Sequence, residues 1–347
     1  MARKILGSLL ALTPVLLVLH YAADVGHTVE FVVAAAALVP LAWLIGESTE
    51  HAAEHTGPGI GGFLNASFGN APELIIALFA INDGLPNVVR GSLAGSVIGN
   101  LLLVLGFALV LGPARLDLGS LAPQLGLVGV AVLLLLVPSV PGFHGNPDRH
   151  SLALVSIPVS IVLLLVYVGE RVAALKRHKE AHSASGHEAS QGSWSLPTAL
   201  AVLGVATVAT ALVSEILVGS IDAFAHSAGL TQFFVSAIIV AIVGNAAEHG
   251  GAVVIAMRGK LELASEIAIT SSAQVALLVA PAVALLSFAI SPAMPLAFRW
   301  EELVGIAAAT AAVGLVIADG RGKRWEGIAL VALYVGVGAW YLLAGDR

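Results

Sequence analysis

The chain has 347 residues, of which 58% are hydrophobic and only 11% are charged, and its formal net charge is -6. Soluble proteins carry about 25% charged residues, so most of this chain does not face water. The small net charge, without a basic stripe, argues against a nucleic-acid partner. The absence of cysteine excludes disulfides, thiolate zinc sites and cysteine nucleophiles.

Long apolar stretches predict helices that cross a membrane, because a hydrocarbon core of about 30 Å requires about 20 apolar residues per helix. The N-terminal stretch lacks a clean small-residue cleavage site and further spans follow it, so we interpret it as a retained helix rather than a signal peptide. We expect about eleven spans, at residues 5–22, 28–46, 60–81, 87–111, 121–138, 151–169, 196–221, 231–257, 263–288, 302–318 and 326–344.

One long polar segment divides the chain nearly in half and defines the predicted domains. They are an N-terminal transmembrane helix (1–26), a first five-helix repeat (27–169), a cytoplasmic linker (170–195) and a second five-helix repeat (196–347). A block of five helices reverses the side from which the next block enters, so the two repeats should have inverted topology. The expected fold class is therefore an all-α integral membrane protein.

The distribution of basic residues predicts the orientation. With the N-terminus inside, most of the sixteen Lys and Arg residues fall in loops on the inner side, as the positive-inside rule requires. Eleven spans then place the C-terminus outside. A chain rich in Ala and Gly and without a transit segment favours a prokaryotic cytoplasmic membrane, although a vacuole stays open.

Two copies of one short phrase stand out: "GNAPE" at 69–73 and "GNAAE" at 244–248. Glu73 and Glu248 lie 175 residues apart, Ser96 and Ser271 keep the same offset, and Asn100 and Gln274 nearly keep it. Upstream, "STE" at 48–50 corresponds to "VSE" at 213–215. Inverted repeats with polar, broken segments at corresponding places are typical of secondary transporters, whose substrate site lies where those segments meet.

The phrase itself suggests a binding site for a hard cation. Pro72 has no N–H to donate, so we expect free backbone oxygens near Phe68 and Gly69, while the second copy must break at Gly244. An asparagine and a glutamate three residues apart project from one helix face. Carboxylate, amide and carbonyl oxygens suit Ca²⁺, and an ionisable group inside a membrane is a functional hypothesis by default.

Other polar residues leave two interpretations open. Ser96, Asn100, Ser271 and Gln274 could be cation ligands or could hold helices together by hydrogen bonds. His249, which follows Glu248, could shuttle protons, because imidazole changes its charge in the physiological pH range, or could be a hydrogen-bonded packing residue.

Residues 61–106 and 233–256, which contain these phrases, resemble the two signature repeats of the calcium/proton (cation/proton) exchangers, within the calcium/cation antiporter superfamily. The resemblance covers essentially the whole chain. It implies one helix plus two inverted five-helix repeats, with Glu73 and Glu248 as the residues that bind the cation or protons. It further implies that the site is completed by Asn70, Asn245, Ser96, Ser271, Gln274 and Asn100. Glu50 and Glu215 would flank the path of the cation. Residues 170–190 are basic and rich in histidine, unlike the acidic regulatory helix of some members.

We therefore expect a secondary transporter rather than an enzyme, exchanging Ca²⁺ for H⁺ without a cofactor. Two ionised glutamates match one Ca²⁺, and once bare they would repel each other in a low dielectric and take up protons. Charge counting gives at least about two protons per Ca²⁺. The nearest alternative is Na⁺/Ca²⁺ exchange, whose members place a further acidic residue on the following helix. This chain has Ser96, Asn100, Ser271 and Gln274 there and no carboxylate in register. Cation selectivity and homo-oligomerisation stay open.

A rival from another class is a membrane zinc metalloprotease. Residues 51–55, "HAAEH", match the H-x-x-E-H pattern, with Glu54 as base and His51 and His55 as zinc ligands. The pattern is short and no third ligand is identifiable, so a solvated helix end is the preferred interpretation.

Overall fold

The structure is a computed structural model that describes residues 2–23, 25–112, 115–143, 149–181, 194–290 and 293–345, and the fold in these ranges is helical, without a named β-strand. The helices of the first half are α1 (Ala2–Leu9), α2 (Leu12–Ala22), α3 (His27–Gly69), α4 (Ala71–Asn82), α5 (Pro86–Ile98), the π-helix η1 (Gly99–Val104), α6 (Leu105–Leu111), α7 (Leu118–Phe143) and α8 (Arg149–Ala181). Those of the second half are α9 (Leu196–Ala228), α10 (Gln232–Phe234), the π-helix η2 (Val235–Val240), α11 (Ala241–Gly244), α12 (Ala246–Met257), α13 (Leu261–Gln274), the π-helix η3 (Val275–Val279), α14 (Ala280–Leu286), the short 3₁₀-helix η4 (Ser287–Ala289), α15 (Trp300–Ile317) and α16 (Arg324–Ala344).

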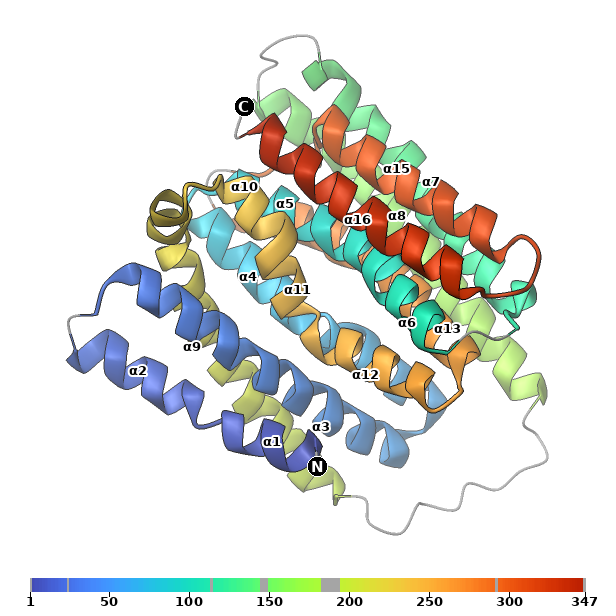
Figure 1. Ribbon diagram of the computed structural model, residues 1–347, viewed down its shortest axis with the longest axis horizontal. Coiled ribbons are helices and arrows are strands. Elements are labelled where there is room, and N and C mark those ends of the chain that lie inside the picture. The colour runs from blue at the N-terminus through green and yellow to red at the C-terminus, as the bar shows by residue number, and fades with distance from the viewer. Residues whose placement is uncertain are drawn as a thin grey trace.

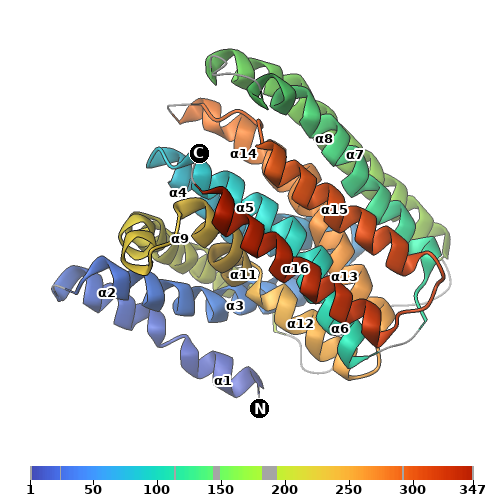
Figure 2. The same cartoon turned by 45° about the horizontal axis from the view of Figure 1, so that its top comes forward.

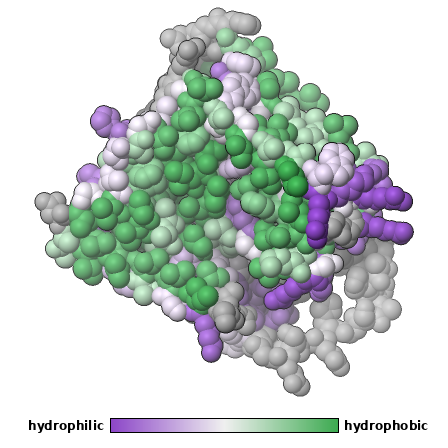
Figure 3. All heavy atoms as spheres, in the orientation of Figure 1, coloured by the Kyte–Doolittle hydropathy of each residue, from purple (hydrophilic) through white to green (hydrophobic). Residues whose placement is uncertain are grey.

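Nine helices in the described ranges are long and apolar enough to cross a membrane, and ten if the bent pair Gln232–Gly244 and Ala246–Met257 is one span. The space-filling view shows hydrophobic residues over most of the visible face (Figure 3). Large apolar side chains such as Leu315 and Leu343 are more than four-fifths exposed. Such a surface suits hydrocarbon and not water.

The helices form two outer groups with a central group between them. Helices α2, α3 and α9 lie on one side, α7, α8 and α15 lie on the other, and α4, α5 and α11–α13 run between them (Figures 1 and 2). The N-terminus lies at the end of the bundle where α9 begins, and the C-terminus lies at the opposite end, near α10 (Figure 1). The two termini are thus separated by the length of the helices.

Helix α3 is assigned as one element but cannot be straight. Its 43 residues would extend about 65 Å, twice the thickness of a hydrocarbon core. A Cβ built on Gly61 would lie only 2.8 Å from the Cβ of Ala53, whereas positions eight apart in a straight helix are separated by about 12 Å. The chain therefore turns back between these residues, where the sequence "HTGPGIGG" separates the second and third predicted spans.

Helix α8 extends into the predicted linker. Residues 170–181 continue helix α8, because "ERVAALKRHKEA" consists mainly of strong helix formers without Gly or Pro. Residues 182–193, which hold the remainder of the polar segment, lie outside the described residues. Trp194 and Ser195 lead directly into α9, whose first turn is capped by the Ser195 hydroxyl accepting a hydrogen bond from Thr198 N–H at 3.3 Å.

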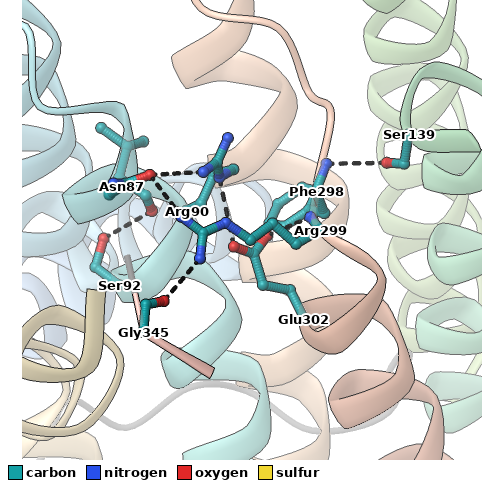
Figure 4. A network of polar contacts seen from close by, with 9 residues as sticks. Asn87, Arg90, Ser92, Ser139, Phe298, Arg299, Glu302 and Gly345 are labelled. Carbon is teal, nitrogen blue, oxygen red and sulfur yellow. Dashed lines mark hydrogen bonds and ion pairs between the residues drawn. The ribbon is translucent and has the colours of Figure 1, made fainter. Parts of the chain in front are cut away.

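A buried polar clamp fastens α5 to α15 and to the end of the chain (Figure 4). Glu302 is fully buried, and its Oε1 lies 3.4 Å from Arg90 Nε while its Oε2 accepts the backbone N–H of Arg299 at 2.9 Å. The guanidinium of Arg299 donates to the carbonyl of Gly345 at 2.9 Å, and both arginines donate to Asn87 Oδ1. The clamp holds the N-terminal end of α5 in place.

We predict that Glu302→Leu destabilises the protein by about 3–5 kcal/mol, because it leaves a buried guanidinium without its carboxylate. Thermal unfolding in detergent, followed by size exclusion, measures this loss. The double variant Arg90→Leu/Glu302→Leu should recover part of it, since it removes both charges. A Glu302→Leu protein as stable as the wild type would contradict the assignment of this clamp.

Candidate functional site

The two repeated phrases break their helices in the same way. Asn70 separates α3 from α4 with φ -100° and ψ 15°, and Asn245 separates α11 from α12 with φ -92° and ψ 10°. Each asparagine carbonyl then accepts the backbone N–H four residues later, at 3.1 Å from Leu74 and 2.9 Å from His249. The second pair of helices is bent by 61° at this point. Both breaks are therefore made at the asparagine.

This finding corrects the predicted cause of the breaks. Pro72 lies in the first turn of α4, where its missing N–H leaves no intrahelical bond unmade. The carbonyl of Phe68 is not free, because it accepts the backbone N–H of Asn70. Proline is thus unnecessary for the break, since the second phrase breaks at Asn245 with Ala247 in the corresponding position.

The glutamate of each phrase lies against the glycine of the other phrase. A Cβ built on Gly244 would lie 3.7 Å from Glu73 Oε1, and a Cβ built on Gly69 would lie 3.7 Å from Glu248 Oε1. The two glycines lack a side chain and so leave space for the opposite carboxyl groups. The two carboxyl groups therefore belong to one site at the crossing of the broken helices.

Polar side chains on α5 and α13 complete this site by hydrogen bonds between the two halves of the chain. Asn245 Nδ2 donates to Ser96 Oγ at 2.8 Å, and Asn70 Nδ2 donates to Gln274 Oε1 at 3.0 Å. All four side chains are at least nine-tenths buried. Both amides thus present their nitrogen to a neighbour in the opposite half.

A second chain of hydrogen bonds runs from Glu248 to a residue outside the predicted site. Ser271 Oγ donates to Glu248 Oε2, and Asn100 Nδ2 donates to Ser271 Oγ at 3.1 Å. The Oδ1 atom of Asn100 accepts from His249 Nε2 at 3.0 Å, so that nitrogen carries the proton. The packing and hydrogen-bonding interpretation of His249 thus has a geometric basis. In the sequence, the position of His249 directly after Glu248 was the only indication that it belongs to the site.

The two halves of the site are not equivalent. Glu248 is held by the Ser271 hydroxyl, whereas Ser96, at the corresponding position, accepts from Asn245 instead. Glu73 Oε2 and Asn245 Oδ1 are buried, and neither has a hydrogen-bond partner among the residues that the structure describes. The amide oxygen of Asn245 is always an acceptor, and the oxygens of Glu73 act solely as acceptors when its carboxyl group is ionised. The site therefore contains unsatisfied acceptor oxygens, which attract a cation or a proton.

The remaining candidate residues lie apart from this network. Glu50 on α3 and Glu215 on α9 are exposed, and neither contacts the hydrogen bonds described above. In the H-x-x-E-H segment, His51 lies between Glu47 and Glu54, and His55 Nε2 donates to the carbonyl of Trp194. No group of three or more His, Asp or Glu residues in the described ranges is placed to hold a metal ion. The zinc-protease alternative gains no support.

Close approach of two helices brings the two halves together at the site. A Cβ built on Gly95 would lie 2.0 Å from the carbonyl oxygen of Ala237, and one built on Gly91 would lie 2.9 Å from that of Phe233. Helix α5 thus packs directly on the backbone of α10 and η2 through two glycines four residues apart, a spacing common at membrane helix contacts. Ser96 follows Gly95 and is thereby placed beside Asn245.

The model of one protein family, described as the sodium/calcium exchanger protein, matches residues 26–174 and 198–342. The chain belongs to this family. The two matched stretches fall on either side of the polar segment and contain one broken phrase each. Membership agrees with the apolar helices, and the chain is an integral membrane protein.

Individual relatives narrow the comparison within the family. The Ca²⁺/H⁺ antiporter ChaA of Bacillus subtilis (strain 168) is 37% identical over 88% of this chain and 90% of its own length. The solved structure of native YfkE is 33% identical and superposes with a TM-score of 0.83 over 98% of this chain and 99% of that one. A sodium-calcium exchanger, 21% identical, superposes with a TM-score of 0.57 over 90% of this chain and 98% of its own and shares the fold.

We predict that Gly95→Ala lowers stability by about 1–3 kcal/mol or more, because the methyl group cannot fit against the Ala237 backbone and must push the two helices apart. The apparent melting temperature in detergent measures this effect. Gly129→Ala on α7 is the matched control, since a Cβ there meets nothing within 4 Å. It should be neutral or slightly stabilising. Equal melting temperatures for the two variants would contradict the close packing.

Proposed function

We propose that this chain is a secondary active antiporter that exchanges Ca²⁺ for H⁺ across its membrane, with Glu73 and Glu248 binding either the cation or protons. The observation that carries the proposal is the meeting of the two glutamates at the crossing of two broken helices, where Glu73 Oε2 and Asn245 Oδ1 are buried without a partner in the described residues. The relative in Bacillus subtilis, which is named a Ca²⁺/H⁺ antiporter, supports the choice of ions.

The chemistry of the site favours a hard divalent cation. Carboxylate and amide oxygens bind Ca²⁺ well, and the ion accepts several flexible oxygen ligands. Asn70 and Asn245 give their amide nitrogens to Gln274 and Ser96, and the buried Oδ1 of Asn245 has no hydrogen-bond partner among the described residues. Two ionised carboxylates balance the charge of one Ca²⁺. We infer that Ser271, Asn100 and His249 orient Glu248 and are not cation ligands.

Exchange follows from the cost of bare charge in this place. Without Ca²⁺, two carboxylates in an apolar bundle would repel each other and lack solvation, so protons bind to them. Bound protons remove the charge that holds Ca²⁺, and bound Ca²⁺ repels protons. Neutralising both carboxylates gives at least about two protons per Ca²⁺. Exposed Glu50 and Glu215 would attract the cation along its path to this site.

We further propose one N-terminal helix followed by two inverted five-helix repeats, with about eleven transmembrane helices. Support comes from the equivalent breaks at Asn70 and Asn245 and from the contact of Ser272 Oγ with the Val97 carbonyl at 3.3 Å, which joins residues 175 apart. The turn at Gly61 supports two spans within α3 and α4. The opposite positions of the termini agree with an odd number of spans. The loop charges favour an N-terminus inside and a C-terminus outside a prokaryotic cytoplasmic membrane.

The second candidate function is Na⁺/Ca²⁺ exchange, which the description of the family and the shared fold of a sodium-calcium exchanger favour. The helices that follow the broken phrases, α5 and α13, contribute serine and amide side chains to the site and no carboxylate. One glutamate per half leaves too little negative charge to form binding sites for both Ca²⁺ and Na⁺. The exchange of Ca²⁺ for H⁺ is therefore preferred.

We predict that the purified protein in liposomes takes up Ca²⁺ when a pH gradient is imposed in the absence of Na⁺. Glu73→Gln should abolish this uptake, because the amide cannot supply the negative charge that both ions require. Glu262→Gln, which changes an exposed glutamate on α13, is the matched control and should transport normally. Uptake driven only by an outward Na⁺ gradient would contradict the proposal and favour the second candidate function.

We predict that Ser271→Ala raises the half-saturating Ca²⁺ concentration about tenfold or more near neutral pH. A hydrogen bond to a charged group contributes about 1.5–3 kcal/mol, and 1.4 kcal/mol corresponds to a factor of ten. The hydroxyl favours ionised Glu248 over its protonated form, so the defect should shrink as the pH is raised and protons compete less. Transport titrations at several pH values measure it. Ser160→Ala, a buried serine on α8 bonded only within its helix, is the control, and a defect that is independent of pH would overturn the explanation.

A further inference from the structure

The two histidines of the H-x-x-E-H segment contact other residues of the chain in this structure. His51 Nε2 lies 3.6 Å from Glu47 Oε1, and its Nδ1 lies 3.4 Å from Glu54 Oε2. The side chains of His51 and Glu47 are only 12% and 11% exposed. One imidazole is therefore placed between two carboxylates, with one carboxylate beside each ring nitrogen.

The start of the second half of the chain docks on the same segment. The Trp194 ring lies against the His51 ring, with centroids 4.8 Å apart and planes inclined by 30°. The carbonyl of Trp194 accepts a hydrogen bond from His55 Nε2 at 2.6 Å. We call this group, formed by Glu47, His51, Glu54, His55 and Trp194, the α3–α9 latch, because it ties the beginning of α9 to α3.

Both ring nitrogens of His51 face a carboxylate oxygen. A neutral ring carries a single N–H, so one of the two carboxylates must face a ring nitrogen with a lone pair. An imidazolium carries an N–H on each ring nitrogen and can donate to both carboxylates. The face of an indole, such as that of Trp194, attracts a cation. Histidine is the side chain that changes its charge between about pH 5 and 8.

The latch connects the segments that lead to the two glutamates. Helix α3 continues to Asn70 and the phrase that contains Glu73, while α9 leads through α10 and α11 to the phrase that contains Glu248. We propose that the α3–α9 latch is a proton-responsive device: acid on its side of the membrane tightens the contact of His51 with Trp194 and slows the rearrangement of the two halves that exchange requires. The slowing of exchange rests on the proposed function, whereas the response of the His51–Trp194 contact to protons does not.

Helix α3 and the helices packed against it carry other charged and titratable groups. On α3, Glu50 is exposed on the same turns. Helix α9 brings Trp194 and Ser195 to the latch, and its next carboxylate is Glu215. Helix α1, which packs against α3, carries exposed Lys4. On α12, which also packs against α3, Glu248 and His249 are bonded to Ser271 and Asn100, and Arg258 follows the end of the helix. His51 is the titratable group that the tryptophan contacts through its ring.

The first experiment follows the fluorescence of Trp194 while the pH is lowered from 8.5 to 5. Trp43, Trp300, Trp325 and Trp340 are replaced by Phe, so that Trp194 reports alone. Protonated imidazole quenches a neighbouring indole, so the emission should fall with acid, and His51→Gln should abolish this fall. His226→Gln, which changes an exposed histidine on α9, should leave it intact. If the fourfold variant does not fold, the difference between wild type and Trp194→Phe gives the same titration.

Emission that does not change with pH, or that still falls in His51→Gln, would overturn the proposal. The second experiment compares Ca²⁺ uptake by wild type and Trp194→Leu while the pH on the latch side is varied. The variant should be faster than the wild type at acidic pH and equal to it at alkaline pH, and identical pH profiles would overturn the regulatory role. If neither protein transports Ca²⁺, the proposed function fails, and the fluorescence titration still decides whether the contact responds to protons.

Discussion

The structure depends on one constraint: a carboxylate inside an apolar helical bundle must be compensated by its surroundings or by a bound ion. Glu73 and Glu248 meet this constraint together. Each carboxyl group lies against a glycine of the opposite phrase, where the missing side chain leaves space for it. The two halves of the chain must therefore cross at this point, and neither glutamate has a complete environment within its own half.

Several features of the bundle serve this crossing. The breaks at Asn70 and Asn245 end one helix and begin the next with the same backbone conformation, so each glutamate enters from the first turn of a helix. Gly91 and Gly95 let α5 lie directly on the backbone of α10 and η2, which places Ser96 beside Asn245. At the far end of α5, Glu302 and its two arginines hold the helix against α15. The site is thus supported from both directions along α5.

The two glutamates have different hydrogen-bond partners. Glu248 is held through Ser271, Asn100 and His249, whereas one oxygen of Glu73 has no hydrogen-bond partner in the described part of the chain. We infer that Glu248 is the more firmly oriented of the two and that Glu73 adjusts more freely to the ion. In the proposed exchange, inequivalent partners would let two protons bind in sequence and not as one event, since each carboxyl group experiences a different set of donors.

The sequence alone was sufficient to predict the membrane environment and most of the spans, because apolar length is a local signal. The repeated polar phrase is also local, and it supplied the candidate residues of the site. It failed where the answer depended on contacts between distant residues. The first break was assigned to Pro72 and the second to Gly244, whereas the structure has both at the asparagine. Helix α8 also continues beyond the predicted span, to Ala181. Only the tertiary structure decided that His249 reaches Asn100, that Glu73 and Glu248 have different partners, and that Trp194 docks on His51. The physical reason is that a hydrogen bond between residues far apart in the chain is set by the packing of whole helices, and no spacing within one helix encodes it.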